Sequence, residues 1–147
     1  MDESEPIRQV AALPVRQAPD GTARVMLVTT LETHRWIIPK GWPWPGEQDY
    51  FAAAEEAREE AGVLGVPSPD SIGVYSYEKR RSSGSVPVQV SVYLLHVTEE
   101  LETWPEADQR TRAWFTLRDA AAAVQEEDLQ ALLLGLEGSD LWAESAG

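Results

Sequence analysis

One segment, residues 41–63 (GWPWPGEQDYFAAAEEAREEAGV), constrains the fold more than any other part of the chain. Its first half is rich in glycine and proline, which favour tight turns and stiff loops. Its second half is rich in alanine, glutamate and arginine, which are strong helix formers. Gly62 follows, and glycine readily takes the positive φ with which many helices end. The segment therefore predicts a stiff loop that leads into a helix ending at Gly62.

The predicted helix has two chemically different sides. The stripe expected to be buried is Tyr50, Ala54, Ala57 and Ala61. Glu56, Glu59 and Glu60 share another side, because residues three and four apart are neighbours on a helix. Like charges at this spacing cost about 0.2–0.5 kcal/mol per pair, whereas hard divalent cations favour clustered carboxylate oxygens. The spacing alone leaves two interpretations open, a solvated acidic face or a divalent-metal site.

The same segment resembles the Nudix box, whose pattern is G-x5-E-x7-R-E-U-x-E-E-x-G-U with U aliphatic. Gly41 and Glu47 fill its first two fixed positions, and Glu55 stands where the family has arginine. The remaining fixed positions, through Val63, all match. The preceding residues WIIPKGWP resemble the W-x-[IL]-P-K-G segment common in this family. The resemblance extends over most of the chain and is greatest to the branch that includes diphosphoinositol polyphosphate and diadenosine polyphosphate hydrolases.

This resemblance implies an α+β fold, a Nudix-type α/β/α sandwich with a mixed sheet and a central catalytic helix. It also implies hydrolysis of phosphoanhydride bonds by water that a Mg²⁺ or Mn²⁺ ion activates. The implied metal ligands are Glu56, Glu59, Glu60 and the carbonyl of Gly41, and Glu59 or Glu60 is implied as the catalytic residue. Members of the family often take a further base or ligand from a distant loop, for which the candidates are Glu99, Glu100, Glu102 and Glu106.

Glu55 departs from the family pattern, and three interpretations follow, in our order of preference. An arginine there would lie one turn before Glu59 and orient that ligand, whereas a glutamate adds repulsion. Another cation, such as Arg58, Arg35 or Lys40, takes over the arginine's role. Alternatively, Glu55 adds metal affinity. In the third case the chain is a catalytically impaired Nudix-like module that binds a ligand or a protein.

Substrate contacts are expected from basic and aromatic side chains around the box. Lys40 precedes it and offers a point charge to a phosphate, or else is simply exposed. Lys79 and Arg81 belong to the one concentrated basic run, which either closes on a polyphosphate or keeps a hairpin tip soluble. Trp42 either stacks on a base or inositol ring or packs on its neighbouring prolines. Arg35 is expected to reach the same cleft.

Composition limits the classes of partner. The chain has 147 residues, which predicts one domain with loose ends at 1–6 and 137–147. A net charge of −13 argues against a nucleic-acid partner and requires cations wherever a phosphorylated substrate binds. The sequence lacks cysteine, a membrane-spanning run and a signal-peptide pattern, so a cytoplasmic protein is expected. A small diphosphate or polyphosphate is the expected partner, with the chain as monomer or homodimer.

The hydrophobic pattern places strands before and after the box helix. Strands are predicted at 8–15, 24–30, 35–38, 72–79, 86–97 and 112–116, and further helices at 117–123 and 128–136. Residues 65–69 and 98–109 are predicted as loops, and 80–85 as a hairpin tip.

Overall fold

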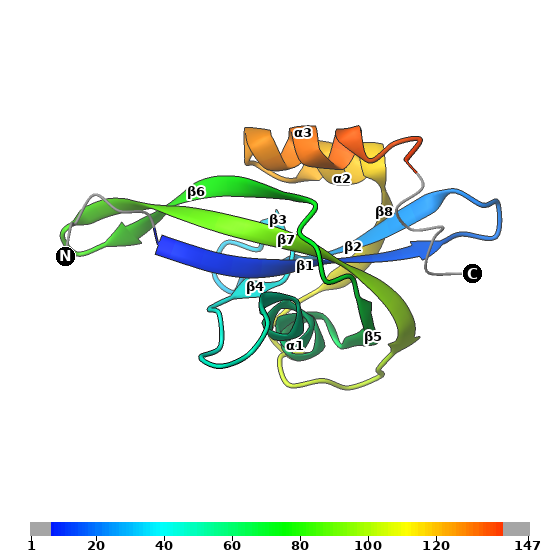
Figure 1. The fold of residues 1–147 in the computed structure, drawn as a ribbon, viewed down its shortest axis with the longest axis horizontal. Coiled ribbons are helices and arrows are strands. Elements are labelled where there is room, and N and C mark those ends of the chain that lie inside the picture. Colours follow the sequence, from blue (N-terminus) through cyan, green and yellow to red (C-terminus); the bar gives the residue numbers. More distant parts are fainter. Residues whose placement is uncertain (1–6, 140–147) are drawn as a thin grey trace.

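A mixed β-sheet lies between α1 on one face and α2 with α3 on the other (Figure 1). The computed structural model describes residues 7–139. The elements in order are β1 (Ile7–Gln17), β2 (Ala23–Thr29), β3 (Trp36–Ile37), β4 (Lys40–Gly41), α1 (Asp49–Ala61), β5 (Val63–Pro67), β6 (Gly73–Arg81), β7 (Gly84–Glu100), β8 (Arg112–Thr116), α2 (Leu117–Ala123) and α3 (Glu127–Gly135). The predicted α+β sandwich is thereby confirmed.

The sheet is organised around the pair β1 and β7, which run parallel from Ile7 beside Val88 to Val15 beside His96. All other pairs are antiparallel: β1 with β2 and β4, β2 with β3 and β8, and β7 with β5 and β6. The central strand order is β3-β2-β1-β7-β5. Pairing of β4 with β1 fixes the loop that opens the box against the middle of the sheet.

Each face of the sheet has its own hydrophobic core. On the α1 side, Ala53 and Ala57 pack with Val10 and Met26. On the other side, Leu129 and Leu133 of α3 pack with strand residues that include Leu13. The predicted stripe on α1 is correct for Ala57 and Ala61 but wrong for Tyr50 and Ala54, which are only half-buried. Ala52 and Ala53 are buried instead, because small side chains let the first turns approach the sheet closely.

The end of α1 is held by residues far along the chain. Gly62 has a φ of 65°, and a Cβ on it would lie 2.6 Å from the Trp104 ring. The Trp104 indole N–H donates to the backbone carbonyl of Glu60 at 3.0 Å. Arg112 stacks on Trp104 and donates to the carbonyls of Ala61 and Gly62. The predicted helix end at Gly62 is confirmed, and these side chains satisfy carbonyls that a helix end leaves free.

Three sequence-based boundaries are wrong. Residues 65–69 were expected to be a loop, but 63–67 form β5, whose identity depends on pairing with β7 and not on its own Gly- and Pro-containing pattern. The predicted loop at 98–109 starts late, since β7 continues to Glu100. The predicted tip at 80–85 is shorter, because the β6–β7 ladder runs to Arg81 beside Gly84.

The ends of the chain lie largely outside the described residues. The predicted loose segment 1–6 and the greater part of 137–147 belong to this undescribed portion. Within 7–139, no helix has the length and apolar character needed to cross a membrane.

Candidate active site

Gly41 and Glu56 meet where β4 passes the middle of α1. Gly41 pairs with Val10 of β1, which presses its backbone against the helix. A Cβ on Gly41 would lie only 2.3 Å from the carboxyl carbon of Glu56 and 2.5 Å from its Oε2. Glycine at position 41 therefore makes room for this carboxylate. Two of the predicted ligand residues are neighbours for this reason.

Glu60 is the buried member of the acidic cluster, with 6% of its surface exposed. Its Oε1 accepts a hydrogen bond from the backbone N–H of Lys40 at 3.3 Å. Nη2 of Arg110 lies 4.0 Å from the same oxygen. The loop before the helix and the segment before β8 thus both direct positive groups at this carboxylate.

Glu56 and Glu60 lie one turn apart on α1, and each carboxyl group affects the pKa of the other. Burial raises the pKa of Glu60 to about 8, against the opposing effect of Arg110. Burial also raises the pKa of Glu56. The pair therefore holds a proton at neutral pH when no other cation neutralises it. Close oxygen donors of this kind, one buried and one half-buried, fit a hard divalent cation, which would displace that proton.

The Glu59 side chain lies near Arg58 and apart from the carboxyl groups of Glu56 and Glu60. Its Oε1 lies 3.9 Å from Nη2 of Arg58, and 40% of its side chain is exposed. Among residues 7–139, no three acidic, histidine or cysteine side chains are close enough to hold a metal ion as they stand. Glu56 and Glu60 would hold the ion together with the Gly41 carbonyl, and Glu59 joins them only by turning away from Arg58.

The side chain of Glu55 is engaged by Arg58. Its Oε2 accepts from Nε of Arg58 at 2.8 Å, one turn away on the exposed side of α1. Since Arg58 is also near Glu59, it is one cation that can replace the arginine missing from position 55. Arg110, with 10% of its side chain exposed, is a second and more buried one.

Of the four acidic candidates in the distant segment, Glu106 is the one whose charge raises the pKa of Glu56. Its Oε1 accepts from Nε of Arg110 at 2.5 Å, and its backbone N–H donates to the Glu59 carbonyl at 3.2 Å. Glu100 instead pairs with Arg16 at 2.8 Å, at the far end of β7. Glu99 pairs with Leu64 in the β5–β7 ladder, and Glu102 is exposed.

A cavity rich in cations opens beside the acidic pair. Its volume is about 430 Å³, and Arg35, Lys40 and Arg110 all line it, with Glu32 as its one acidic side chain. Burial lowers the pKa of Lys40 and Glu60 opposes that change, which reflects how closely the cavity adjoins the carboxylates. In a chain with a net charge of −13, this is a local reversal of sign suited to phosphate groups.

Comparison with known protein families identifies the family of this chain. The NUDIX domain model matches residues 6–133. The chain belongs to the Nudix hydrolase family.

Two relatives show the level of similarity within the family. Nudix hydrolase 13, mitochondrial, of Arabidopsis thaliana is 32% identical over 75% of this chain and 57% of its own length. Diphosphoinositol polyphosphate phosphohydrolase 3-beta of Homo sapiens is 38% identical over 62% of this chain and 53% of its own. The chain thus spans about half the length of these curated relatives.

A solved structure shares the fold. The crystal structure of a C. elegans Ap4A hydrolase binary complex has a TM-score of 0.66 over 89% of this chain and 95% of that one, at 20% identity. This likeness supports the Nudix architecture of the sheet and its three helices.

The predicted substrate residues of this Nudix chain fall into two groups. Arg35 and Lys40 line the cation-rich cavity. Trp42 and Lys79 contact each other, with the Lys79 ammonium 5.3 Å from the Trp42 ring centroid. Arg81 is exposed at the end of β6, two residues beyond Lys79 and next to the hairpin tip. The basic run therefore reaches the Nudix loop through Lys79, and Trp42 keeps about half its surface exposed.

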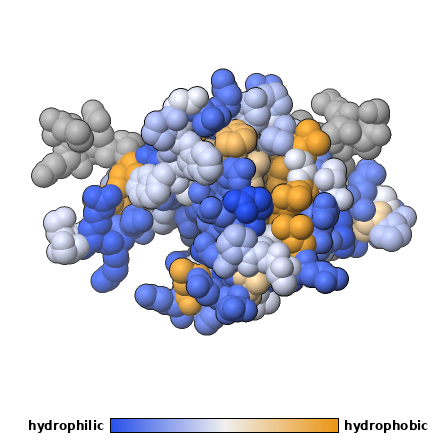
Figure 2. Space-filling model, turned by 90° about the horizontal axis from the view of Figure 1, so that it is seen from below, coloured by the Kyte–Doolittle hydropathy of each residue, from blue (hydrophilic) through white to orange (hydrophobic). Residues whose placement is uncertain are grey.

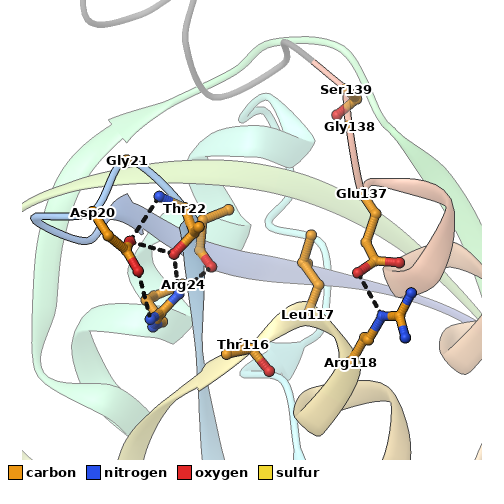
Figure 3. A pocket seen from close by; sticks show the side chains of 11 residues that line it. Asp20, Gly21, Thr22, Arg24, Thr116, Leu117, Arg118, Glu137, Gly138 and Ser139 are labelled. Carbon is orange, nitrogen blue, oxygen red and sulfur yellow. Dashed lines mark hydrogen bonds and ion pairs between the residues drawn. The ribbon is translucent and has the colours of Figure 1, made fainter.

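Other hollows share no lining residue with the cation-rich cavity. One of them, about 640 Å³, lies between the β1–β2 turn and α2, where Asp20 pairs with Arg24 and Arg118 with Glu137 (Figure 3). These pairs leave little unbalanced charge for an anion. A smaller groove of about 230 Å³ separates α1 from β5. Figure 2 shows the face on the α1 side as largely hydrophilic, with apolar side chains gathered in a few patches.

Sequence reasoning missed Arg110, although two arginines, Arg110 and Arg112, directly after an acidic stretch were a usable signal. It also missed Glu126, which precedes α3 and influences Lys40. No local pattern marks Glu126, because only the fold brings the α2–α3 connection towards the Nudix loop.

Proposed function

We propose that this chain hydrolyses phosphoanhydride bonds with Mg²⁺ or Mn²⁺ as cofactor. The substrates would be nucleoside diphosphate-linked compounds, diadenosine polyphosphates or diphosphoinositol polyphosphates. The observation that carries the proposal is the pair formed by the buried Glu60 and the half-buried Glu56 against Gly41, directly beside the cavity lined by Arg35, Lys40 and Arg110. A hydrolase of polyphosphates needs a metal-binding group of carboxylates and a set of cations for the phosphates, and the two must lie side by side.

The chain's own residues divide the work. Arg35, Lys40 and Arg110 would bind the phosphate oxygens and neutralise charge that develops on the leaving group. Glu59 or Glu60 would accept a proton from the attacking water as its oxygen bonds to phosphorus and the bridging P–O bond breaks. The divalent ion, when bound, supplies Lewis-acid polarisation and lowers the pKa of water. The leaving phosphate departs with the electrons of the broken bond, and no enzyme-linked intermediate forms.

The first test measures product release by purified protein on a panel of these substrates, with and without Mg²⁺. Glu59→Gln and Glu60→Gln are each expected to lower kcat by roughly 100-fold or more, as for loss of a general base or a metal ligand. Glu127→Gln is the matched control, because Glu127 is exposed at the start of α3. Unchanged turnover in both Nudix-box variants would refute the assigned roles.

The second candidate function is a Nudix module that binds its ligand without hydrolysing it. Glu55 in place of the box arginine favours it, because the carboxylate ties up Arg58. Metal-dependent binding of a diphosphate with no product after prolonged incubation would support this alternative.

A further inference from the structure

The three cations that line the cation-rich cavity are held by different kinds of partner. Arg110 forms ion pairs with carboxylates. Nη1 of Arg35 instead donates to Oε1 of Gln125, an amide oxygen, at 2.5 Å. The Lys40 ammonium lies 5.0 Å from the ring centroid of Tyr77. Two of the three cations therefore rest against uncharged groups.

Uncharged partners are unexpected in so acidic a chain, which has 25 acidic and 12 basic side chains. Most arginines in the described part of the chain pair with a carboxylate: Arg8, Arg16, Arg24, Arg58, Arg110 and Arg118. Among residues 7–139, neither Arg35 nor Lys40 has a carboxylate oxygen within 4.0 Å. Acidic residues are nonetheless near, since Glu32 lines the same cavity and two glutamates directly follow Gln125. A shortage of carboxylates therefore does not explain why these two cations lack ion pairs.

Gln125 holds Arg35 across a large separation in the sequence. Arg35 lies between β2 and β3, where its backbone N–H donates to Oγ1 of Thr30 at 3.0 Å and its Nε donates to Oγ1 of Thr33 at 3.3 Å. Gln125 reaches the same guanidinium from the connection between α2 and α3. Arg35 is exposed, so without these contacts its long side chain would sample many rotamers. The contacts to Thr33 and Gln125 fix the guanidinium in the cavity wall.

Tyr77 holds Lys40 in a corresponding way. The Tyr77 hydroxyl donates to Oε1 of the buried Gln9 at 2.7 Å, which fixes the ring. The Lys40 backbone is fixed as well, because Lys40 pairs with Ala11 of β1. The face of an aromatic ring attracts an ammonium group without neutralising its charge. The position of the ammonium is therefore fixed, while its charge remains available to an anion.

An uncharged partner matters when the ligand is a phosphate. A carboxylate next to the cation would repel the phosphate, and like charges a few ångströms apart repel far more strongly in a partly buried site than in bulk water. A neutral acceptor or ring fixes the cation and adds no repulsion. Fixing the cation before the ligand arrives also lowers the entropy cost of binding.

We propose that Gln125 and Tyr77 are positioning residues, which hold Arg35 and Lys40 by uncharged contacts so that both cations keep their full charge for the phosphates of the substrate. The inference rests on the proposed function and adds two residues that act on the phosphates through Arg35 and Lys40. It predicts that a substitution which keeps the contact to Arg35 but adds a negative charge weakens phosphate binding.

Gln125→Glu is that substitution, because a carboxylate oxygen accepts from a guanidinium as an amide oxygen does. The probe is methylenediphosphonate, a diphosphate analogue that water does not cleave, and calorimetric titration in Mg²⁺ measures its Kd. Gln125→Glu is expected to raise Kd by about tenfold or more, because the introduced charge lies beside the phosphate site. Gln17→Glu, the same change at the exposed end of β1, is the matched control and should leave Kd within about twofold of wild type.

A purely structural role of Gln125 gives the opposite result. The introduced carboxylate would then hold Arg35 at least as firmly as the amide does, and Kd would stay the same or fall. That result would overturn the inference, as would a wild-type protein that does not bind the analogue.

Tyr77→Phe and Tyr77→Leu test the contact to Lys40. Tyr77→Phe keeps the ring face and should bind the analogue as wild type does. Tyr77→Leu removes the ring and should raise Kd roughly two- to fivefold, the value of one exposed cation–π contact. Urea unfolding of both variants establishes that each is folded under the assay conditions. Equal Kd values for the two variants would overturn the role of Tyr77.

The binding measurement does not depend on turnover, so the inference and the proposed function fail separately. If no member of the substrate panel is hydrolysed, the proposed function fails, while the effect of Gln125→Glu on Kd still supports or overturns the inference. A chain that hydrolyses the panel but binds the analogue equally well with Gln125→Glu would support the proposed function and overturn this inference.

Discussion

At the scale of single residues, the protonated pair Glu56 and Glu60 connects folding with pH. Glu60 is expected to keep its proton in the folded, metal-free chain up to a pH of about 8 and to lose it near 4.5 when unfolded. Below pH 4.5 Glu60 is protonated in both the folded and the unfolded state, and above pH 8 it is ionised in both. The folded state therefore binds more protons than the unfolded state only between these two pH values. Stability should therefore fall as pH rises from about 5 through 8, at roughly 1.4 kcal/mol per unit of pKa difference.

This prediction is checked by urea unfolding in EDTA at several pH values. Glu60→Gln carries a neutral amide at every pH, so its loss of stability between pH 5 and 8 should be smaller than that of wild type. Arg110 and Lys40 face the same carboxylate and oppose the effect of burial on the pKa of Glu60, but they do not reverse its direction. A wild-type stability that rises over this range would contradict the argument.

Glu55→Arg tests what replaces the missing box arginine. If Arg58 and Arg110 already supply the positive charge near Glu59 and Glu60, restoring the family residue should change kcat/KM by less than about tenfold, or 1.4 kcal/mol. Steady-state kinetics in Mg²⁺ measure this, with Glu127→Arg as a control for the added charge. A large gain from an inactive parent would instead identify the natural chain as a binding module.

The sequence was sufficient to predict Gly41, Glu56 and Glu60 as neighbours, because helical spacing and the box pattern are local. It was not sufficient to predict Arg110 or Glu126. Arg110 immediately precedes β8, and the pairing of β8 with β2 places Arg110 beside the end of β2. There Nη1 of Arg110 donates to the Thr29 carbonyl at 2.9 Å, and the guanidinium lies near Glu60. Such contacts depend on strand pairing between distant segments, for which no spacing rule exists in one sequence.

At the scale of elements, the side chains of Arg112 and Trp104 hold the C-terminal end of α1 in place. Arg112 donates to the carbonyls of Ala61, Gly62 and Leu101 while its guanidinium lies 4.0 Å from the Trp104 ring centroid. Arg112→Lys removes the planar fork that makes these contacts together. We expect a loss of roughly 1.5–3 kcal/mol in the free energy of unfolding, the range for hydrogen bonds from charged groups.

The matched control is Arg118→Lys, because 78% of the Arg118 side chain is exposed and its pair with Glu137 should contribute little. Urea denaturation of both variants in EDTA compares them. Equal stability of the two variants would show that the hydrogen bonds of Arg112 do not stabilise the C-terminal end of α1.

Element boundaries show where sequence reasoning is limited. Most strands and all three helices follow from hydrophobic periodicity and from the helix-forming composition of the box segment. β5 does not, because a Cβ at Gly65 would lie 2.2 Å from the backbone oxygen of His96, so this strand exists by close approach to β7. Its glycine looks like a loop residue until its partner strand is known.

At the scale of the whole molecule, an acidic chain must bind its cation before it can attract a polyanion. Mg²⁺ that binds the folded state alone stabilises it by RT ln(1 + [Mg²⁺]/Kd), about 2.7 kcal/mol at 100 times Kd. Because the ion competes with the proton on Glu56 and Glu60, the gain in Tm should be larger at pH 8 than at pH 6. Thermal unfolding with 10 mM Mg²⁺, roughly the concentration for a weak site, against K⁺ at equal ionic strength measures it. Glu60→Gln should abolish both the gain and its pH dependence. A Tm that rises equally with Mg²⁺ and K⁺ would reduce the effect to screening of the charge of −13, and the acidic pair would then have no part in binding the metal.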